Sequence, residues 1–394
     1  MRRPRFFSRR AERPRLLFVV NADWFFLSHR LPLGLACLEA GFDVTVCAGE
    51  SAARADVEKA GFRFHPLPIE RGGTSPVEEL RTVAALLRVY RRERPDVVHH
   101  VTIKPVIYGS LAARALGVRG VVNAVSGLGY AFIPRPEDNL AHRLLGRSLW
   151  AAYRLSLDGK RTRVIFQNED DRSTFVERKL VAASRTVLIN GSGVDFGTFS
   201  PRELPDKEFV ALLPARLLWD KGVGEFVEAA KQLKKRWPQA RFALLGRIDP
   251  GNPAAIDEKQ IEDWVKTGDV EWWGHCEHHE MPDVYARATV VVLPSYREGL
   301  PLALAEAAAM GRACITTDVP GCRNTVAHGV TGWLVKPRDP VTLEQALDEA
   351  LRDPEETKRR GENGPDFARA RFSVDAVIQR TFAVYRELLD GRAS

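Results

Sequence analysis

The sequence lacks the features that mark several common classes of protein. No apolar run is long enough to cross a bilayer, and no uninterrupted apolar segment follows the basic first residues, so neither a transmembrane helix nor a secretory signal is expected. The five cysteines form no Cys-x-x-Cys pair, which fits ordinary thiols in a reducing cytosol. The turn at 21–26 lacks the glycine fingerprint of a dinucleotide site. No basic stripe is interleaved with aromatic residues in the body of the chain, which argues against nucleic-acid binding.

What is present is the composition of a globular protein with more than one domain. The chain has 394 residues, 45% hydrophobic and 28% charged, which is too long for a single ordinary core. Most of the net charge of +7 lies at the start, where residues 1–15 hold seven arginines against Glu12. We expect residues 1–14 to be a basic tail that is either disordered or rests on an anionic membrane surface.

Apolar runs alternate with amphipathic helical patterns along the rest of the chain. In the first half, we expect strands at 16–20, 43–48, 97–102, 118–125, 164–167 and 186–189, and helices near 28–40, 77–93, 105–116, 137–157 and 169–181. In the second half, we expect strands at 209–214, 241–246, 270–273, 289–294, 313–317 and 333–335, and helices near 224–237, 258–266, 280–287, 301–311, 341–352 and 374–389. This repetition of strand and helix predicts doubly wound parallel sheets.

The chain is therefore expected to be an α/β protein with two Rossmann-like domains that face each other across a cleft. The predicted boundaries are an N-terminal domain over 15–196, a linker over 197–207 that contains two prolines, and a C-terminal domain over 208–370. A last helix within 371–394 is expected to pack back on the N-terminal domain.

The most specific pattern is a pair of glutamates, Glu298 and Glu306, on either side of a Gly-Leu-Pro turn and the start of an apolar helix. The apolar run 288–295 predicts a buried strand before them, so Glu298 is expected in a strand-to-helix loop, with Pro301 at the first helical position. Open α/β sheets bind ligands in such loops, at the carboxyl ends of their strands. Two acids there suit the hydroxyl groups of a sugar and a ribose, which indicates an enzyme that uses a nucleotide-sugar.

Two cations follow the first strand of the predicted C-terminal domain. Arg216 and Lys221 lie between that strand and a helix that is expected to begin near Gly224. A guanidinium fork and an ammonium group near a helix start suit a diphosphate. Because the two glutamates belong to the same domain, we favour a binding role over a solvated surface pair.

These residues, together with Gly246-Arg247, Pro294-Ser295 and the segment 331–335, resemble the family-4 retaining glycosyltransferases of the GT-B fold, and the resemblance covers nearly all of 15–389. The segments 215–223, 246–253, 294–299 and 126–130 are similar to a bacterial branch of that family. That branch builds polyprenyl-diphosphate-linked oligosaccharides and includes N-acetylgalactosaminyltransferases.

The resemblance implies a role for each matching residue. Arg216 and Lys221 would hold the donor diphosphate and neutralise the leaving group. Glu298 would orient the transferred sugar, and Glu306 would accept hydrogen bonds from the ribose hydroxyls. The residues expected to border the donor are Gly246, Arg247, Ser295, Gly299, Leu300 and Pro301. Because no Asp-x-Asp motif stands at a suitable strand end, neither a metal ion nor another cofactor is expected.

The chain departs from the family pattern in its first domain. Many relatives carry a histidine after the strand that corresponds to 121–125, where this chain has Ser126, so no histidine base can be assigned to that position. Ser126 remains a candidate substrate contact. Further candidates are His99, His100, Lys104 and Asn123, although histidines at strand ends more often serve in packing.

Three weaker signals each leave two interpretations. His275, Cys276, His278 and His279 crowd one loop, which we expect to be a surface loop and not a metal site. The basic segment 141–163 predicts a helix with its apolar face in the core, or a contact with the membrane surface. The aromatic run 24–26 either meets a lipid-linked acceptor or caps the core.

We therefore expect a cytoplasmic enzyme, peripheral at the inner face of the cell membrane, that moves a hexose or N-acetylhexosamine such as N-acetylgalactosamine. The donor would be a UDP-sugar and the acceptor a polyprenyl-diphosphate-linked saccharide. An anionic membrane surface is a further expected partner, and nucleic acid is not. The alternatives are a UDP-sugar epimerase of the same fold and a non-catalytic scaffold that binds sugar nucleotides or membranes.

Overall fold

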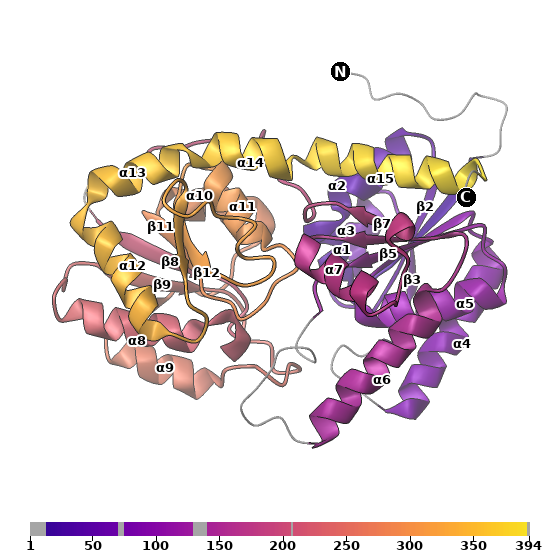
Figure 1. Ribbon diagram of the computed structural model, residues 1–394, viewed down its shortest axis with the longest axis horizontal. Helices are drawn as coiled ribbons and strands as arrows, with labels where there is room; N and C mark the ends of the chain where they lie inside the picture. The colour runs from indigo at the N-terminus through magenta and orange to yellow at the C-terminus, as the bar shows by residue number, and fades with distance from the viewer. Residues whose placement is uncertain (1–12, 70–74, 129–139, 206–207, 392–394) are drawn as a thin grey trace. The chain divides into compact units, whose positions relative to one another are not determined.

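The computed structural model describes residues 13–69, 75–128, 140–205 and 208–391, without the side chains of 140–145 (Figure 1). By its internal contacts the chain divides into two units. One consists of the chain up to Ser192 together with the chain from Val374, and the other of Gly193–Ser373. Most of the predicted basic tail, residues 1–12, lies outside the described residues. None of the described helices has both the length and the apolar character of a membrane span.

The first unit is built on a seven-stranded parallel sheet in the order β3-β2-β1-β4-β5-β6-β7. Its strands are β1 (Arg15–Val19), β2 (Asp43–Ala48), β3 (Arg63–Pro66), β4 (Val97–Val101), β5 (Gly120–Val125), β6 (Thr162–Phe166) and β7 (Thr186–Leu188). Its helices are α1 (Asp23–His29), α2 (Leu31–Glu39), α3 (Arg54–Lys59), α4 (Pro76–Glu93), the π-helix η1 (Pro105–Gly109), α5 (Ser110–Ala115), α6 (Leu140–Leu157), α7 (Glu169–Glu177), the 3₁₀-helix η3 (Ala183–Arg185) and α15 (Val374–Leu389). The strand order reverses between β1 and β4, which is where doubly wound sheets bind ligands.

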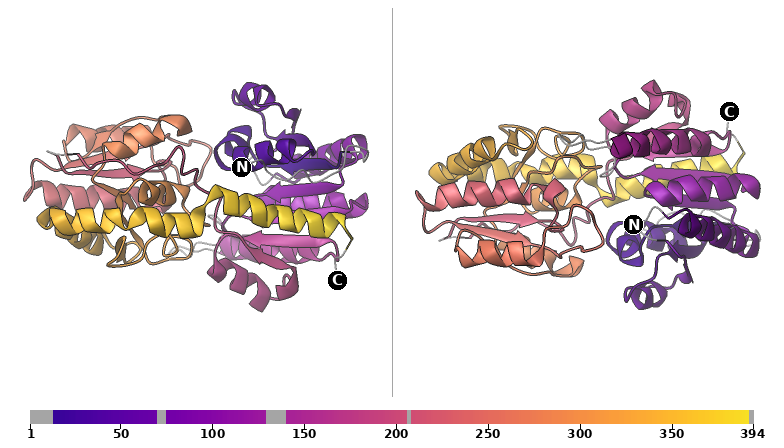
Figure 2. Two further views of the ribbon diagram at one scale, coloured as in Figure 1. Left: turned by 90° about the horizontal axis from the view of Figure 1, so that it is seen from above. Right: turned by 90° about the horizontal axis from the view of Figure 1, so that it is seen from below.

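Both faces of this sheet are buried. Successive side chains along a strand point to opposite sides of the sheet, so each strand contributes to two cores. On β1, Leu16 and Phe18 join a core with α2 and α15, whereas Leu17 and Val19 join a core with α4 and α5. Figure 2 shows the helices on both sides of the sheet. This burial explains why the central strands are continuous apolar runs.

The last helix, α15, belongs to the first unit although it is the last element of the chain. It packs against α2, β4 and β5 (Figure 1). Tyr385 is fully buried there, and Phe382 and Leu388 are also part of the core. The chain therefore completes the first unit only with its final helix.

The second unit contains a six-stranded parallel sheet in the order β10-β9-β8-β11-β12-β13. Its strands are β8 (Val210–Pro214), β9 (Arg241–Leu245), β10 (Glu271–Trp272), β11 (Val290–Leu293), β12 (Ala313–Thr317) and β13 (Gly332–Val335). Its helices are the 3₁₀-helices η4 (Trp219–Lys221) and η5 (His278–Glu280), and α8 (Val223–Lys234), α9 (Glu258–Lys266), α10 (Met281–Ala286), α11 (Leu302–Ala309), α12 (Pro340–Arg352), α13 (Pro354–Glu362) and α14 (Gly364–Phe372). Helices α8 and α12 cover one face, and α10, α11 and α14 cover the other.

Some elements differ from the sequence-based expectation. Strand β3 and the helices α3, α13 and α14 were not expected, and the helix expected at 28–40 begins earlier and is interrupted at Arg30, where φ is −129°. The helix expected at 105–116 begins as the π-helix η1. These elements are short or carry little apolar periodicity, so their local pattern is weak.

The segment expected to be a linker is, over its described residues 197–205, part of the second unit. Phe199 is 2% exposed and lies in the core with α10, α11 and α14. The Val194 N–H donates to the Phe372 carbonyl at 2.7 Å. The division between the units therefore falls at Ser192/Gly193 and at Ser373/Val374 and not at 197–207 and 371.

Candidate active site

The carboxyl edge of the second sheet gathers the residues that the sequence singled out. β8 lies between β9 and β11, and all three strands run parallel. Arg216 and Lys221 follow β8, Arg247 follows β9, and Glu298 follows β11. Because the carboxyl ends of parallel strands share one edge of a sheet, three adjacent loops bring these side chains to one place.

Lys221 and Glu298 form a direct ion pair in this edge. The Ser295 hydroxyl donates to the same Glu298 oxygen at 2.8 Å, and the side chains of Lys221 and Glu298 are only 16% and 15% exposed. A partly buried carboxylate needs such donors to offset its lost hydration. Glu298 therefore neutralises the cation that was expected to face the diphosphate.

Two glycines allow the loops that carry this pair to approach neighbouring backbone closely. Gly222 has φ of 73°, and a Cβ atom there would lie 2.3 Å from the Pro294 carbonyl oxygen. Gly321 has φ of 82°, and a Cβ atom there would lie 2.3 Å from the carbonyl oxygen of Glu298. Only glycine fits both the left-handed backbone and the close approach. The loops after β8, β11 and β12 are thus fixed against one another.

Arg216 is paired with an acid that the sequence-based assignment missed. Its Nη1 donates to Asp249 Oδ2 at 2.7 Å, and Asp249 lies in the loop after β9. Asp220 lies beside Lys221, and its Oδ1 is buried with no hydrogen-bond partner among the residues that the structure describes. Burial raises the pKa of Asp220, partly offset by the nearby Lys221 cation. The two cations are therefore surrounded by three carboxylates, those of Asp220, Asp249 and Glu298. The roles of Asp220 and Asp249 were not predicted from the sequence.

Gly246 and Arg247 differ in how firmly they are held. Gly246 has φ of 152°, a Cβ atom there would lie 1.8 Å from the Ala215 carbonyl oxygen, and its N–H donates to Gly274 at 2.7 Å. Arg247 is half exposed and lies within 2.6 Å of His275 Nε2 and 3.3 Å of Glu277. Gly246 is thus a fixed backbone position, and Arg247 is a surface cation beside it.

The turn between the two glutamates is almost as predicted. Helix α11 begins at Leu302, so Pro301 is the N-cap with an extended backbone and not the first helical residue. Leu300 is buried in the second-unit core, and the Glu298 N–H donates to the Pro320 carbonyl at 3.2 Å. Gly299 and Leu300 therefore form a tight connection that sets the position of Glu298.

Glu306 is buried, and both of its carboxylate oxygens have partners. His278 Nε2 lies 2.6 Å from Oε1, and the Tyr285 hydroxyl donates to Oε2 at 3.1 Å. Only 3% of Glu306 is exposed. His278 lies in an exposed loop, as predicted, but its contact with Glu306 on α11 was not predicted. Among the described residues, no group of three or more His, Cys, Asp or Glu side chains could hold a metal ion.

The candidates of the first unit are mostly interior. His100 Nδ1 lies 2.7 Å from Asn123 Oδ1 and its Nε2 lies 2.8 Å from the Tyr90 hydroxyl, and all three residues are buried. His99 Nδ1 lies 2.6 Å from the Tyr385 hydroxyl of α15. In this arrangement the two histidines and Asn123 pack inside the unit, so a direct substrate contact is not supported for them.

Lys104 and Ser126 have less buried positions. Lys104 Nζ lies 2.6 Å from Glu79 Oε1, and both side chains are about one-fifth exposed. Ser126 directly follows β5 at the carboxyl edge of the first sheet and is partly exposed. These two residues can therefore still be reached by a ligand at that edge.

Two residues that were not singled out mark the switch point of the first sheet. The register pairs Val19 with His100, so Asn21 and Thr102 lie side by side just beyond β1 and β4. Thr102 has φ of 76°, which is rare for a β-branched residue, and the π-helix η1 follows it. Asn21 Oδ1 and Thr102 Oγ1 are buried and have no partner within the described part of the chain. Strain and unpaired polar atoms at a switch point are features of binding sites.

Comparison with known proteins agrees with this arrangement. Residues 15–168 match the family described as "Glycosyl transferase 4-like", and residues 198–367 match "Glycosyl transferases group 1". The chain is 24% identical over 388 residues to the N,N'-diacetylbacillosaminyl-diphospho-undecaprenol alpha-1,3-N-acetylgalactosaminyltransferase of Campylobacter jejuni, covering 95% of this chain and 99% of that protein. It is 26% identical over 311 residues to the UDP-Gal:alpha-D-GlcNAc-diphosphoundecaprenol alpha-1,3-galactosyltransferase of Escherichia coli, covering 76% of this chain and 77% of that protein.

Solved structures share the fold of the whole chain. The sucrose-phosphate synthase of Thermosynechococcus elongatus matches with a TM-score of 0.78 at 21% identity, covering 96% of this chain and all of that one. HepE of Anabaena, solved in complex with UDP, matches with a TM-score of 0.71 at 18% identity, covering 95% of this chain and all of that one. With two parallel-sheet units and a matching family over each, the chain belongs to the group 1 and glycosyl transferase 4-like glycosyltransferases of the GT-B fold.

Proposed function

We propose that this glycosyltransferase moves a hexose or N-acetylhexosamine from a UDP-sugar to a polyprenyl-diphosphate-linked saccharide, with retention of the anomeric configuration. The observation that carries the proposal is the gathering of Arg216, Lys221 and Glu298 at one sheet edge, in the same unit as the buried Glu306. The named activities of the Campylobacter and Escherichia relatives support the lipid-linked acceptor and, for the second, the UDP-sugar donor.

In the proposed reaction, the bond between the anomeric carbon and the donor phosphate oxygen breaks while an acceptor hydroxyl oxygen bonds to that carbon from the same face. The acceptor proton passes to the departing phosphate oxygen, so UDP leaves as the second product. Negative charge grows on that oxygen, and fixed cations beside it stabilise the transition state. Arg216 and Lys221 would supply this stabilisation, which is why we propose that the reaction needs no metal ion.

Donor binding would change the partners of both cations. In the structure, Arg216 faces Asp249 and Lys221 faces Glu298. An ammonium group has three donors and a guanidinium has five, so each can keep its carboxylate and still donate to a phosphate oxygen. Glu298 would then be held by Lys221 and Ser295 while it accepts a hydroxyl of the transferred sugar.

The acceptor would approach the first unit at the β1–β4 switch point. Asn21 Oδ1 and Thr102 Oγ1 offer unpaired polar atoms that suit the hydroxyl and N-acetyl groups of a saccharide. Trp24 and Phe25, on α1 immediately after this edge, are partly exposed and suit the apolar part of a lipid-linked acceptor.

The direct test is a product assay with purified protein, a panel of UDP-sugars and a lipid-linked saccharide. We expect UDP and a longer lipid-linked saccharide with one donor, and mass spectrometry identifies the added sugar. An altered UDP-sugar formed without acceptor would instead indicate an epimerase. No UDP release from a folded protein with any common donor would contradict the proposal.

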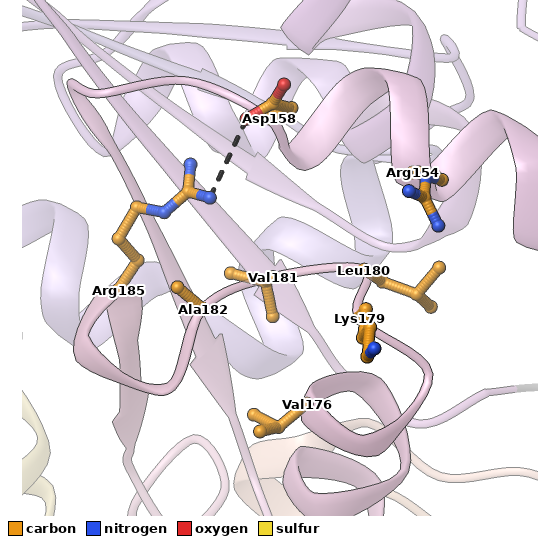
Figure 3. A pocket seen from close by; sticks show the side chains of 8 residues that line it. All are labelled: Arg154, Asp158, Val176, Lys179, Leu180, Val181, Ala182 and Arg185. Carbon is orange, nitrogen blue, oxygen red and sulfur yellow. Dashed lines mark ion pairs between the residues drawn. The ribbon is translucent and has the colours of Figure 1, made fainter.

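We also propose a peripheral contact with anionic membrane through the first unit. A cavity of about 400 Å³ lies between the end of α6 and the segment after α7, on the edge of the sheet opposite the carboxyl ends of the strands (Figure 3). It is lined by Arg154, Asp158, Val176, Lys179, Leu180, Val181, Ala182 and Arg185. Neither Arg154 nor Lys179 has an ion pair among the described residues, and the neighbouring Leu155 is 63% exposed. Free cations beside an exposed leucine suit anionic headgroups.

Sedimentation with lipid vesicles tests this contact. We expect the protein to bind vesicles that contain phosphatidylglycerol and not vesicles of phosphatidylcholine alone. Substituting Arg154 and Lys179 together with Ala should weaken binding to the vesicles. The control substitutes Arg88 and Arg91 on α4 with Ala, which removes the same charge and should not weaken binding. Equal binding by both double variants would contradict the assignment.

A further inference from the structure

The carboxylate of Glu306 is held by two side chains from outside its own helix. Glu306 lies on α11, His278 lies in η5 and Tyr285 lies on α10. The contact of 2.6 Å to His278 Nε2 and the hydrogen bond of 3.1 Å from Tyr285 approach different carboxylate oxygens. A buried carboxylate with one donor on each oxygen has a fixed orientation.

His278 itself is held firmly but is not part of the core. Its ring lies 5.4 Å from that of the buried Phe199, and its turn is fixed by a reciprocal capping box between Glu277 and Glu280. Its side chain is nevertheless 46% exposed. A histidine that only donated to a buried carboxylate could itself be fully buried. A histidine beside a ligand site must contact both the carboxylate and the solvent-accessible side where the ligand binds.

We propose that His278 and Tyr285 are positioning residues that orient the Glu306 carboxylate toward the ribose hydroxyls of a nucleoside diphosphate, and that the charge of His278 tunes the affinity for that nucleotide. The inference rests on the proposed function, in which Glu306 contacts the ribose. Each carboxylate oxygen has two lone pairs, so an oxygen that accepts one bond from the protein keeps one lone pair for a hydroxyl. A carboxylate that is already oriented loses less entropy when the ribose binds.

The charge state of His278 follows from its surroundings. The hydrogen bond with Glu306 raises the pKa of His278 above its ordinary value of 6.5, against an opposing effect of burial. The other ionisable groups near it are Glu277, His279 and Glu280 on its own turn, and Tyr285 and the Cys276 thiol toward α10, while the segment that packs against its ring contributes the apolar Phe199.

The direction of the pH effect follows from that raised pKa. The charged imidazolium makes the stronger, charge-assisted bond to Glu306. This bond is fully formed below pH 6.5 and is lost as the pH rises through the raised pKa of the folded protein. Nucleotide affinity should therefore be higher on the acidic side of this titration and lower on the alkaline side.

Calorimetric titration of the full chain with UDP and with 2′,3′-dideoxy-UDP, from pH 6 to pH 9, tests the inference. We expect His278→Gln to weaken UDP binding by roughly 10-fold and to flatten its pH dependence. His279→Gln is the matched control, because this neighbouring histidine is exposed and its side chain makes no hydrogen bond or ion pair with the described residues. Binding of dideoxy-UDP should be weaker in the native protein and unchanged by His278→Gln, because the ribose hydroxyls are gone.

The outcomes distinguish a failure of the proposed function from a failure of the positioning role alone. If the native protein binds no UDP, the proposed function fails. If the native protein binds UDP and His278→Gln behaves like His279→Gln at every pH, the positioning role is overturned. Equal weakening of UDP and dideoxy-UDP would also overturn it, because it would show a general structural defect. Tyr285→Phe removes the second donor with little change in shape, and the same selective loss for UDP is expected if His278→Gln does not fold.

Discussion

At the scale of single residues, both cations of the candidate site are paired with acids. Lys221 is paired with Glu298, Arg216 with Asp249, and Asp220 has a raised pKa because of burial. A cation that is held by an acid before the donor arrives has its position fixed in advance, and a fixed charge needs no reorganisation during the reaction. The acids therefore contribute by holding the cations in place.

Replacing Lys221 tests this electrostatic role. We expect Lys221→Ala to lower kcat by 100- to 1000-fold, or about 3 to 4 kcal/mol of transition-state stabilisation. Lys231→Ala removes the same charge from the exposed surface of α8 and should leave kcat unchanged. Steady-state kinetics of both variants checks the prediction, and equal rates would show that Lys221 does not act on the leaving group.

The glycine at 321 gives a second prediction at this scale. In Gly321→Ala, the new methyl group meets the Glu298 carbonyl and the backbone is left-handed, so we expect a loss of more than about 2 kcal/mol in the free energy of unfolding. Gly329→Ala is the matched control, because its φ of 74° is similar but nothing lies within 4 Å of the added atom. There the loss should be only about 1 kcal/mol. Urea unfolding of both variants distinguishes the clash from the backbone cost.

At the scale of elements, β4 is a buried strand that contains two titratable side chains. His99 and His100 stand next to each other on a fully buried strand, each with a hydrogen-bond partner on its Nδ1. Burial lowers the pKa of His100 to about 4, and it also lowers the pKa of His99 well below its ordinary value. Both histidines are therefore neutral in the folded protein at pH 7.

A loss of stability in mild acid follows. Below pH 6.5 the unfolded chain binds a proton at His100 that the folded chain does not, so stability falls as the pH decreases from 6.5 toward 4. Between pH 7.5 and pH 5 this site alone should lower the free energy of unfolding by on the order of 2 kcal/mol. We expect His100→Gln to reduce the pH dependence in urea unfolding, and His279→Gln to leave it as it is. An unchanged pH dependence in His100→Gln would contradict the assignment.

At the scale of the whole molecule, the order of the chain and the order of the fold differ. The second unit is continuous in sequence, whereas the first is completed by α15 from the far end of the chain. Tyr385 contacts His99 across 286 positions, and Arg163, which is 3% exposed, pairs with Glu387. The first unit therefore cannot be complete until α15 has been made.

Truncation tests this dependence. A chain that ends at Ser373 exposes the core surface covered by Phe382, Tyr385 and Leu388, so we expect lost protection from hydrogen exchange across the first unit. Protection of β8 to β13 should persist, because both cores of the second unit lie within it. A chain that ends at Asp390 is the control and should behave like the full chain. Unchanged protection in the first unit would show that α15 is dispensable.

Much of the fold was predictable because its pattern is local. β2, β12, α9 and α15 have the predicted bounds, since buried strands of a parallel sheet are continuous apolar runs and these helices have marked apolar periodicity. β3 was missed because it is a four-residue edge strand with one buried side chain. The position of Arg216, Lys221 and Glu298 at one sheet edge could be predicted, because each follows a predicted strand and parallel strands end at a common edge.

The partners of those residues could not be predicted in the same way. Asp249 is 33 positions from Arg216, His278 is 28 positions from Glu306, and the preferences of single residues do not specify which loops meet. His99 and His100 looked like candidate ligands because they stand at the end of a predicted strand. Their burial depends on contacts with α15 and α4, which the sequence did not predict. Local patterns determine which segments form strands and helices, since backbone geometry and apolar periodicity act over a few residues. The pairing of charges and the burial of polar groups depend on contacts between distant segments, and these contacts exist only in the folded chain.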